Sequence, residues 1–439
     1  MKKRKLKLKK KTIIIFVLII LISFLFVIIK INKHNEKNIK NKVDLVSVVY
    51  NKLKEQNIDK DFIKWVDLNY NGSLKKINKL LEKNNYSESI WHDSTGYSYI
   101  VLNDLYNKKY DKLDNVKIVE NSKDNSTLSF VGDVSLADNW HIIPKYDERG
   151  KGVEGILSSD ILKIMRDSDL MVANSEFTVS DRGSPLANKL YTFRAKPERL
   201  TIYDEMGVDL VTLANNHVYD YGKEAFLDML DSFKEYKIPY IGAGHDLEEA
   251  MRPYYFIVNG YKIAFLSATR AEKYIMTPEA TETTEGVFRC YDPTNLINQI
   301  SKVKQESDYV IALVHYGTEG SHELEQVQID SSKQYIDAGA DAVIGHHAHT
   351  LQGIEFYNDK PIIYNLGNFI FNNETIDTAI FQIILDDDGK MEYYIIPALQ
   401  KDCYTDILIE GGKSRVINNM NSWSINAYID ENGKVSKKE

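Results

Sequence analysis

The sequence contains little cysteine. Its 439 residues include two, Cys290 and Cys403, and no Cys-x-x-Cys pair, which excludes the zinc sites recognised by that spacing. The two thiols could pair, but their separation in the sequence does not decide the question. Internal repeats are also absent. The candidate metal ligands of this chain are therefore histidine, carboxylate and amide side chains.

Positive charge is concentrated at the start of the chain and is outweighed by negative charge elsewhere. Eight lysine and arginine residues lie between positions 2 and 11, and the next charged residue is Lys30. Without these eight and Lys30, the 55 basic residues fall to 46 against 63 acidic ones, a net charge of −17. A domain of this charge repels polyanions at long range, so we predict no nucleic-acid partner.

Residues 12–29 form an uncharged, apolar stretch. As a helix it spans roughly 27 Å, enough to cross the hydrocarbon core of a membrane. The alternative is a secretory signal peptide, whose apolar region is usually shorter and is followed by small residues at a cleavage site. Because Lys30-Ile31-Asn32-Lys33 follows here, we predict an uncleaved single-pass anchor in the cell membrane. The preceding lysines place residues 1–11 in the cytoplasm and the main domain outside the cell.

The rest of the chain divides by composition into three parts. Residues 30–124 are polar and rich in Lys and Asn, which predicts a small helical stalk or extension. In residues 125–400, short apolar runs alternate with amphipathic segments, a pattern typical of an α/β layered domain. Residues 401–439 are a polar C-terminal extension with a strand-like piece near residues 424–429.

Periodicity places individual elements within residues 125–400. Residues 222–236 have apolar side chains at helical spacing, and two hairpins are predicted around Asn259-Gly260 and Asn358-Asp359. The predicted strands of the alternating part are residues 127–131, 170–173, 210–213, 309–314 and 342–344. Two later strands, residues 379–385 and 393–396, close the domain.

Five of the apolar runs end in polar residues that can bind metal. They are followed by Asp133, by Asn174 and Glu176, by Asn215-Asn216-His217, by His315, and by a histidine cluster at residues 346–349. An α/β sheet usually presents ligands at the ends of its strands. Oxygen and imidazole ligands gathered there suit a two-metal hydrolytic centre.

The segment Asn215-Asn216-His217 combines a metal ligand with an acid. The amide oxygen of Asn216 can bind a hard cation, and His217 can donate a proton to a leaving group. Asp220 could fix the tautomer of His217 and raise its basicity. The alternative interpretation is that two amides and a histidine form an ordinary turn.

The cluster Gly345-His346-His347-Ala348-His349 is the strongest single signal. In an extended chain His347 and His349 point to the same side, so both can reach one metal ion. Three histidines so close together are costly to bury without a ligand or proton role. For His315, which Glu319 follows, a core histidine satisfied by hydrogen bonds is an equally good interpretation.

Taken in order, these motifs resemble the CapA domain of poly-γ-glutamate capsule proteins, which is related to the calcineurin-like metallophosphoesterases. The motifs are GDV (132–134), NSE (174–176), NNHxxDxG (215–222), HxGxE (315–319), GxHxH (345–349) and YNLGNF (364–369), and the resemblance covers residues 127–400. It implies a four-layer α/β/β/α metallophosphatase-like sandwich that binds one or two divalent ions, with Mn, Zn and Fe as candidates. It also implies membrane attachment and a role in making, exporting or anchoring poly-γ-glutamate.

The resemblance assigns roles to residues of this sequence. The implied metal ligands are Asp133, Glu176, Asn216, His315, His347 and His349. His217 would be the proton donor, oriented by Asp220, and Asn215 and Glu319 are candidates for substrate contact. The chain departs from the phosphoesterase pattern in having Ser135 where the first motif ends in histidine, and Glu176 at an aspartate position. His346, beside the expected pair, is not assigned as a ligand.

Three hypotheses about function follow and stay open. The first is a metal-dependent hydrolase or transferase acting on an anionic polymer or its phosphorylated precursor. The second is a non-catalytic scaffold in a polymer export complex, and the third is a wall-associated metallophosphodiesterase. Ser135 favours the scaffold, whereas Asn216, His217 and Asp220 favour the enzyme. The expected partners are the membrane and subunits for capsule polymer synthesis or export.

Overall fold

The computed structural model describes residues 113–119, 125–258, 261–272, 276–386 and 389–438. The predicted cytoplasmic segment, the anchor at residues 12–29 and nearly all of the predicted extension lie outside these residues, as does the turn Asn259-Gly260. Within the described ranges, no helix is long and apolar enough to cross a membrane.

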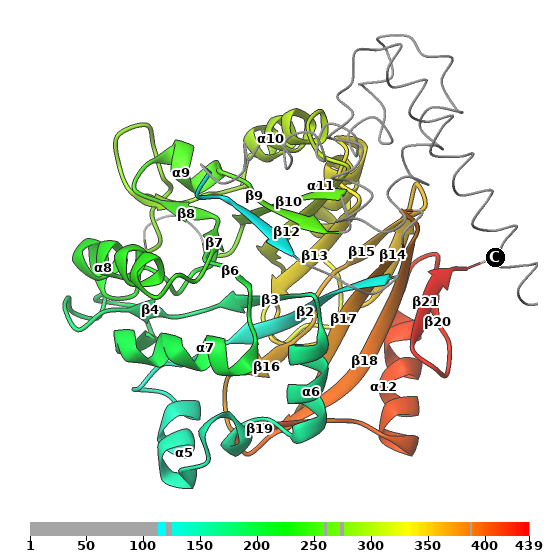
Figure 1. The fold of residues 1–439 in the computed structure, drawn as a ribbon, viewed down its shortest axis with the longest axis horizontal. Coiled ribbons are helices and arrows are strands. Elements are labelled where there is room, and N and C mark those ends of the chain that lie inside the picture. Colours follow the sequence, from blue (N-terminus) through cyan, green and yellow to red (C-terminus); the bar gives the residue numbers. More distant parts are fainter. Residues whose placement is uncertain (1–112, 120–124, 259–260, 273–275, 387–388, 439) are drawn as a thin grey trace, which may run out of the picture. The chain divides into compact units, whose positions relative to one another are not determined.

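The described chain is built on two large β-sheets (Figure 1). The seven-stranded sheet has the order β1 (Val116–Val119), β9 (Tyr254–Val258), β10 (Tyr261–Thr269), β12 (Tyr309–Tyr316), β13 (Ala342–His347), β15 (Lys360–Ile363) and β14 (Ile354–Tyr357). The ten-stranded sheet has the order β20 (Ala427–Ile429), β21 (Lys434–Lys437), β18 (Met391–Lys401), β17 (Ile376–Asp386), β2 (Asn125–Val134), β3 (Leu170–Ser175), β6 (Leu210–Thr212) and β7 (Tyr240–Ile241), with β16 (Asn368–Ile370) on β2 and β19 (Tyr404–Ile407) on β18.

A hydrophobic core lies between the two sheets. Phe130 of β2 contacts Phe265 of β10 and Phe381 of β17, with ring centroids 6.3 Å and 6.0 Å apart. Strand β3 shows how the sequence supplies apolar side chains to this core, since side chains alternate between the two faces of a strand. Its Leu170 and Val172 face the inter-sheet core, while its Met171 and Ala173 face the helices on the other side. Strands buried on both faces are apolar throughout.

Helices cover the outer face of each sheet (Figure 1). The ten-stranded sheet is covered by α5 (Ile142–Arg149), α6 (Ser159–Asp167), α7 (Thr201–Met206) and α8 (Gly222–Glu235). The seven-stranded sheet is covered by α9 (Leu247–Met251), α10 (Thr294–Lys304) and α11 (Gln326–Asp337). Helix α12 (Glu410–Trp423) packs its Val416, Ile417 and Met420 against the inter-sheet core. The predicted mixed α/β fold is confirmed.

The elements predicted from periodicity are present, and several run further than predicted. Strands β2, β3, β6, β12, β13, β17 and β18 and helix α8 correspond to the predicted ranges, and both hairpins are antiparallel pairs. Strand β12 extends to Tyr316 and β13 to His347, so His315, His346 and His347 are among the last residues of their strands. Beyond residue 400 the chain adds β19, α12, β20 and β21.

Candidate metal centre

The polar residues predicted at strand ends come together at one place. Strands β2, β3 and β6 are parallel neighbours in the ten-stranded sheet, and β12 and β13 are parallel neighbours in the other sheet. Parallel strands present their carboxyl ends at a common edge. The two such edges face each other, which gathers Asp133, Asn174, Glu176, Asn216, His315, His347 and His349.

Asp133 and Glu176 are the two carboxylates of this cluster, and both are fully buried. The side-chain amide of Asn174 lies between them and donates to Asp133 Oδ1 at 2.8 Å and to Glu176 Oε2 at 3.0 Å. His349 Nδ1 lies 3.1 Å from the other oxygen of Asp133. One amide and one imidazole thus fix the orientation of both carboxylates.

The second oxygen of Glu176, Oε1, is an unsatisfied acceptor of the cluster. It is buried and accepts no hydrogen bond from the described residues. Three imidazole nitrogens surround it without bonding to it: His315 Nε2 at 3.6 Å, His349 Nε2 at 3.7 Å and His217 Nε2 at 4.0 Å. Burying a carboxylate oxygen without a hydrogen bond costs free energy. The distances of 3.6–4.0 Å from Glu176 Oε1 to the three imidazole nitrogens leave room for a cation between them.

Two overlapping groups of side chains could hold a metal ion. One consists of Asp133, Glu176 and His315, and the other of Glu176, His347 and His349, with the ligand atoms of each group within 4.8 Å of one another. The side-chain oxygen of Asn216 lies 2.8 Å from His315 Nε2, so it borders the first group. A mixed nitrogen and oxygen donor set of this kind fits a divalent transition metal.

His347 and His349 reach the site by a route that differs from the extended segment expected from the sequence. Strand β13 ends at His347, and both histidines have positive φ, +92° and +57°. Non-glycine residues rarely adopt this conformation, and backbone strain of this kind recurs at active sites. The two imidazoles converge because the backbone turns after the strand.

The protonation states of His315 and His347 suit cation binding, whereas the pKa of His349 is raised, because burial, which lowers it, is outweighed by the hydrogen bond and charge of Asp133 and by other polar neighbours. Burial, followed by the neighbouring charge of Asp133, raises the pKa of Glu176 well above its usual value. Burial and the nearby His347 lower the pKa of His315 well below its usual value, and burial lowers the pKa of His347 to about 3. Neutral imidazoles have a free lone pair for a metal, and a cation would relieve the repulsion between the two carboxylates.

His217 is held beside the carboxylates by its own partners. His217 Nδ1 lies 2.7 Å from Asp220 Oδ2, and the same oxygen accepts from the backbone N–H of Phe193 at 2.7 Å. The contact between the His217 ring and Asp220 leaves Nε2 directed toward Glu176. A carboxylate on one ring nitrogen fixes the ring and its tautomer, which is the arrangement expected of a positioned proton donor.

Two motif glycines allow the strand ends to approach a crossing segment closely. A Cβ atom on Gly132 would lie 1.8 Å from the carbonyl oxygen of Gly367, and one on Gly345 would lie 1.9 Å from that of Tyr364. The segment of residues 364–367 therefore passes against both β2 and β13 immediately before their ligand residues. Backbone contact of this kind requires a residue without a side chain.

The other sequence-predicted residues occupy different positions around the cluster. Asn215 is fully buried beneath it and donates to Asn174 Oδ1 and to the carbonyl of Ser175, so its amide holds the loop. Glu319 is exposed and lines a cavity beside the cluster. His346 is buried, and its Nε2 lies 3.2 Å from the carbonyl oxygen of Val131, away from the metal-ligand groups.

The sequence did not identify two residues of the site, Asn368 and Lys189. Asn368, whose Oδ1 lies 2.8 Å from His349 Nδ1, belongs to the quoted YNLGNF motif, so its position there was the available signal. Lys189 gave no signal, because it lies in a polar loop. Its side chain is 4% exposed and lies 2.8 Å from Asp220 Oδ1 and 3.0 Å from Glu272 Oε2.

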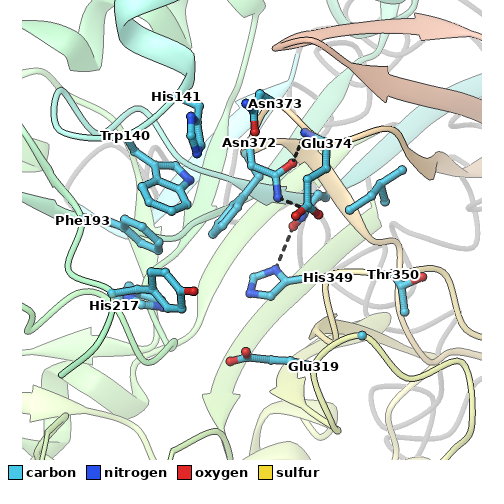
Figure 2. Close-up of a pocket in the computed structure, with 15 residues that line it drawn as sticks. Trp140, His141, Phe193, His217, Glu319, His349, Thr350, Asn372, Asn373 and Glu374 are labelled. Atoms are coloured by element: carbon cyan, nitrogen blue, oxygen red, sulfur yellow. Dashed lines mark hydrogen bonds between the residues drawn. The ribbon is translucent and has the colours of Figure 1, made fainter.

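A cavity of about 570 Å³ opens beside the cluster (Figure 2). His217, Glu319 and His349 line it, together with the aromatic side chains of Trp140, Tyr191, Phe193 and Phe371. Its volume lies within the range of roughly 300–1,000 Å³ typical of small-molecule sites. A ligand in this cavity would reach both His217 and the edge of the metal-ligand groups.

Comparison with known proteins gives matches over most of this domain. Residues 127–373 match the model of a family described as "Bacterial capsule synthesis protein PGA_cap". The chain is 31% identical over 293 residues to the capsule biosynthesis protein CapA of Bacillus anthracis, covering 64% of this chain and 69% of that protein. It is 32% identical over 291 residues to the PGA biosynthesis protein CapA of Bacillus subtilis, covering 65% and 74%.

Solved structures give weaker matches. A structure described as a novel phosphatase from Mycoplasma pneumoniae overlaps 63% of this chain and 95% of its own, with 14% sequence identity and a TM-score of 0.38. A TM-score this low does not establish a shared fold.

Proposed function

Because this chain belongs to the family of bacterial capsule synthesis proteins described as PGA_cap, we propose that it takes part in making, exporting or anchoring a poly-γ-glutamate capsule. The family match covers more than half of the chain, and the Bacillus relatives are named for capsule and PGA biosynthesis. Polymer synthesis or export subunits are its proposed partners.

The second part of the proposal is a metal-dependent hydrolase-type site. Asp133, Glu176, Asn216, His315, His347 and His349 would hold one or two divalent ions. Such an ion would polarise a phosphoryl or carbonyl oxygen and supply a nucleophilic water. The observation that carries this proposal is Glu176 Oε1, which is buried, receives no hydrogen bond and is surrounded by three imidazoles.

In this site the residues of the chain itself would bind and protonate the substrate. His217 would donate a proton from Nε2 to the leaving group, because Asp220 occupies Nδ1. Glu319 would contact the substrate from the cavity rim. The order of helix layer, sheet, sheet and helix layer supports a metallophosphatase-like sandwich, in which ligands come from strand ends.

The alternative is a non-catalytic scaffold that keeps the fold. Ser135 favours it, because this buried hydroxyl stands where the related phosphoesterases have a histidine ligand. A scaffold would need the domain in place at the membrane but would not need His217.

A complementation experiment separates these functions. A strain lacking this gene would receive the wild-type chain, His217→Ala, or His245→Ala as a control, since His245 is an exposed histidine on another part of the surface. The enzyme proposal predicts loss of surface poly-γ-glutamate with His217→Ala and normal polymer with His245→Ala. Normal polymer with both variants would favour the scaffold. Normal polymer in the strain that lacks the gene would contradict both of these functions and favour the third hypothesis, a wall-associated metallophosphodiesterase.

We also propose that residues 12–29 anchor the protein in the cell membrane with the main domain outside. The uncharged stretch after a basic block supports this orientation. Protease added to intact cells is expected to remove the domain. Survival of the domain while a known surface protein is digested would contradict this orientation.

A further inference from the structure

The cavity beside the metal-ligand groups has an aromatic wall. Trp140 lies with its ring centroid 4.9 Å from Phe193 and 5.7 Å from Tyr191. Phe371 meets Phe193 edge to face at 5.5 Å. These side chains continue to the centre itself, because Phe193 packs on His217 at 4.3 Å and Phe371 on His349 at 4.6 Å. Phe193 and Phe371 are 3% and 4% exposed, so the rings open to a ligand on this wall are those of Trp140 and Tyr191.

The opposite side of the cavity is polar and carries amides. Figure 2 shows Asn372, Asn373 and Glu374 across the cavity from Trp140 and Phe193. Amide side chains both donate and accept hydrogen bonds. The amide of Asn372 is bonded to Glu374 and Gln400, so the exposed amide of Asn373 is the one that matches hydroxyl or acetamido groups. An aromatic wall that faces an amide suits a ring that is apolar on one face and polar at its edge.

Among the described residues that line the cavity, only histidines, including His217 and His349, could pair with an anionic chain. These described residues include no lysine or arginine, while Glu319 and Glu374 are both carboxylates. The nearby Lys189 is buried and already paired with Asp220 and Glu272. Poly-γ-glutamate carries a carboxylate on every residue, so these walls would repel it.

We propose that this cavity binds a neutral hexopyranose ring, so that the site acts on a saccharide or a sugar-linked group rather than on the polyglutamate chain. This inference rests on the proposed metal-dependent site, whose substrate class it names. The C–H face of the sugar would lie on the aromatic wall, and its hydroxyl or acetamido groups would bond to the amide of Asn373. The reacting phosphoryl or carbonyl group would lie beside His217.

Tyr191 is the residue best placed to test the idea. Its side chain is 52% exposed at the cavity, so its removal should leave the core intact. The loop that carries it is fixed from below, since Lys189, two residues earlier, is buried and paired with two carboxylates. A fixed, exposed aromatic loses little entropy when a ligand stacks on it.

The experiment is isothermal titration calorimetry of the full chain with a neutral tetrasaccharide of N-acetylglucosamine and, separately, with poly-γ-glutamate. The tetrasaccharide is expected to bind, and Tyr191→Ala is expected to weaken its binding roughly five- to tenfold, the usual effect of losing one aromatic contact. The matched control is Tyr428→Ala, which removes a tyrosine that is 51% exposed on β20, outside the cavity. It should bind like the wild type.

Three results would overturn the proposal: no binding of the tetrasaccharide, equal binding by Tyr191→Ala and the wild type, or binding of poly-γ-glutamate alone. Metal analysis of the purified protein, with the titration repeated after metal removal with EDTA, separates this proposal from the metal-dependent site. Saccharide binding that depends on Tyr191 in a protein that never contained metal would support the cavity proposal and contradict the metal site. Normal metal content without saccharide binding would contradict the cavity proposal alone.

Discussion

Replacing Gly132 with alanine is expected to disrupt the centre through backbone packing, without touching a ligand. The added Cβ would lie 1.8 Å from the carbonyl oxygen of Gly367 and 2.9 Å from its carbonyl carbon. Contacts under 3.0 Å are essentially never seen for real Cβ atoms, so the segment around Gly367 must move by more than about 1 Å in a tightly packed interior. That movement breaks the 3.0 Å hydrogen bond from Asp133 N to Gly367 O.

The cost of this substitution can be bounded from these contacts. Overpacking a buried site costs about 1–3 kcal/mol, and a buried backbone group left without its partner costs about 1–3 kcal/mol. We therefore expect Gly132→Ala to lose about 3 kcal/mol of unfolding free energy. At roughly 2–4 °C per kcal/mol for a domain of a few hundred residues, its melting temperature should fall by roughly 6–12 °C. Its metal content should also fall, because Asn368 and Asp133 are paired in register across β16 and β2.

The measurement is thermal unfolding followed by circular dichroism, with metal analysis of the folded protein. Gly411→Ala is the control. Gly411 lies in α12 and has open space around its Cβ position, so alanine there should stabilise the helix slightly, by about 0.5–1 kcal/mol. A melting temperature for Gly132→Ala within about 2 °C of the wild type would refute the packing argument.

Three further outcomes are expected. The double variant His347→Ala/His349→Ala should remain folded and lose its metal, since a large core does not depend on these two ligands; unchanged metal stoichiometry in the folded variant would contradict the ligand assignment. His217→Ala should keep its metal and lower turnover by roughly 10²–10⁴-fold, with a much smaller loss on substrates that have good leaving groups; an equal loss on both kinds of substrate would argue against proton donation. Lys189→Met should lose about 3–5 kcal/mol in chemical denaturation, because it leaves Asp220 and Glu272 without their buried partner. Lys163→Met, which breaks an exposed pair with Asp167, should lose less than about 1 kcal/mol, and equal losses from the two lysine variants would show that burial of Lys189 is unimportant.

The sequence by itself determined the elements and the kinds of ligand. Strands and helices of an α/β domain follow local periodicity, because side chains alternate in a strand and recur every 3.6 residues in a helix. Each group of ligand residues lies at the end of a strand or a few residues after it, so Asp133, Asn216 and His315 could be identified from short segments. The family motifs supplied the expectation that these residues come together in one site.

The tertiary structure alone decided how the ligand residues of different strands come together. His315 and His349 come from the seven-stranded sheet and Glu176 from the ten-stranded sheet, so the unsatisfied oxygen of Glu176 exists only where the two sheets face each other. The buried position of Lys189 and the aromatic wall around Trp140 likewise depend on loops that are distant in sequence. Such contacts leave no periodic signal, because local residue patterns record which face of an element is buried but not what another segment places against it.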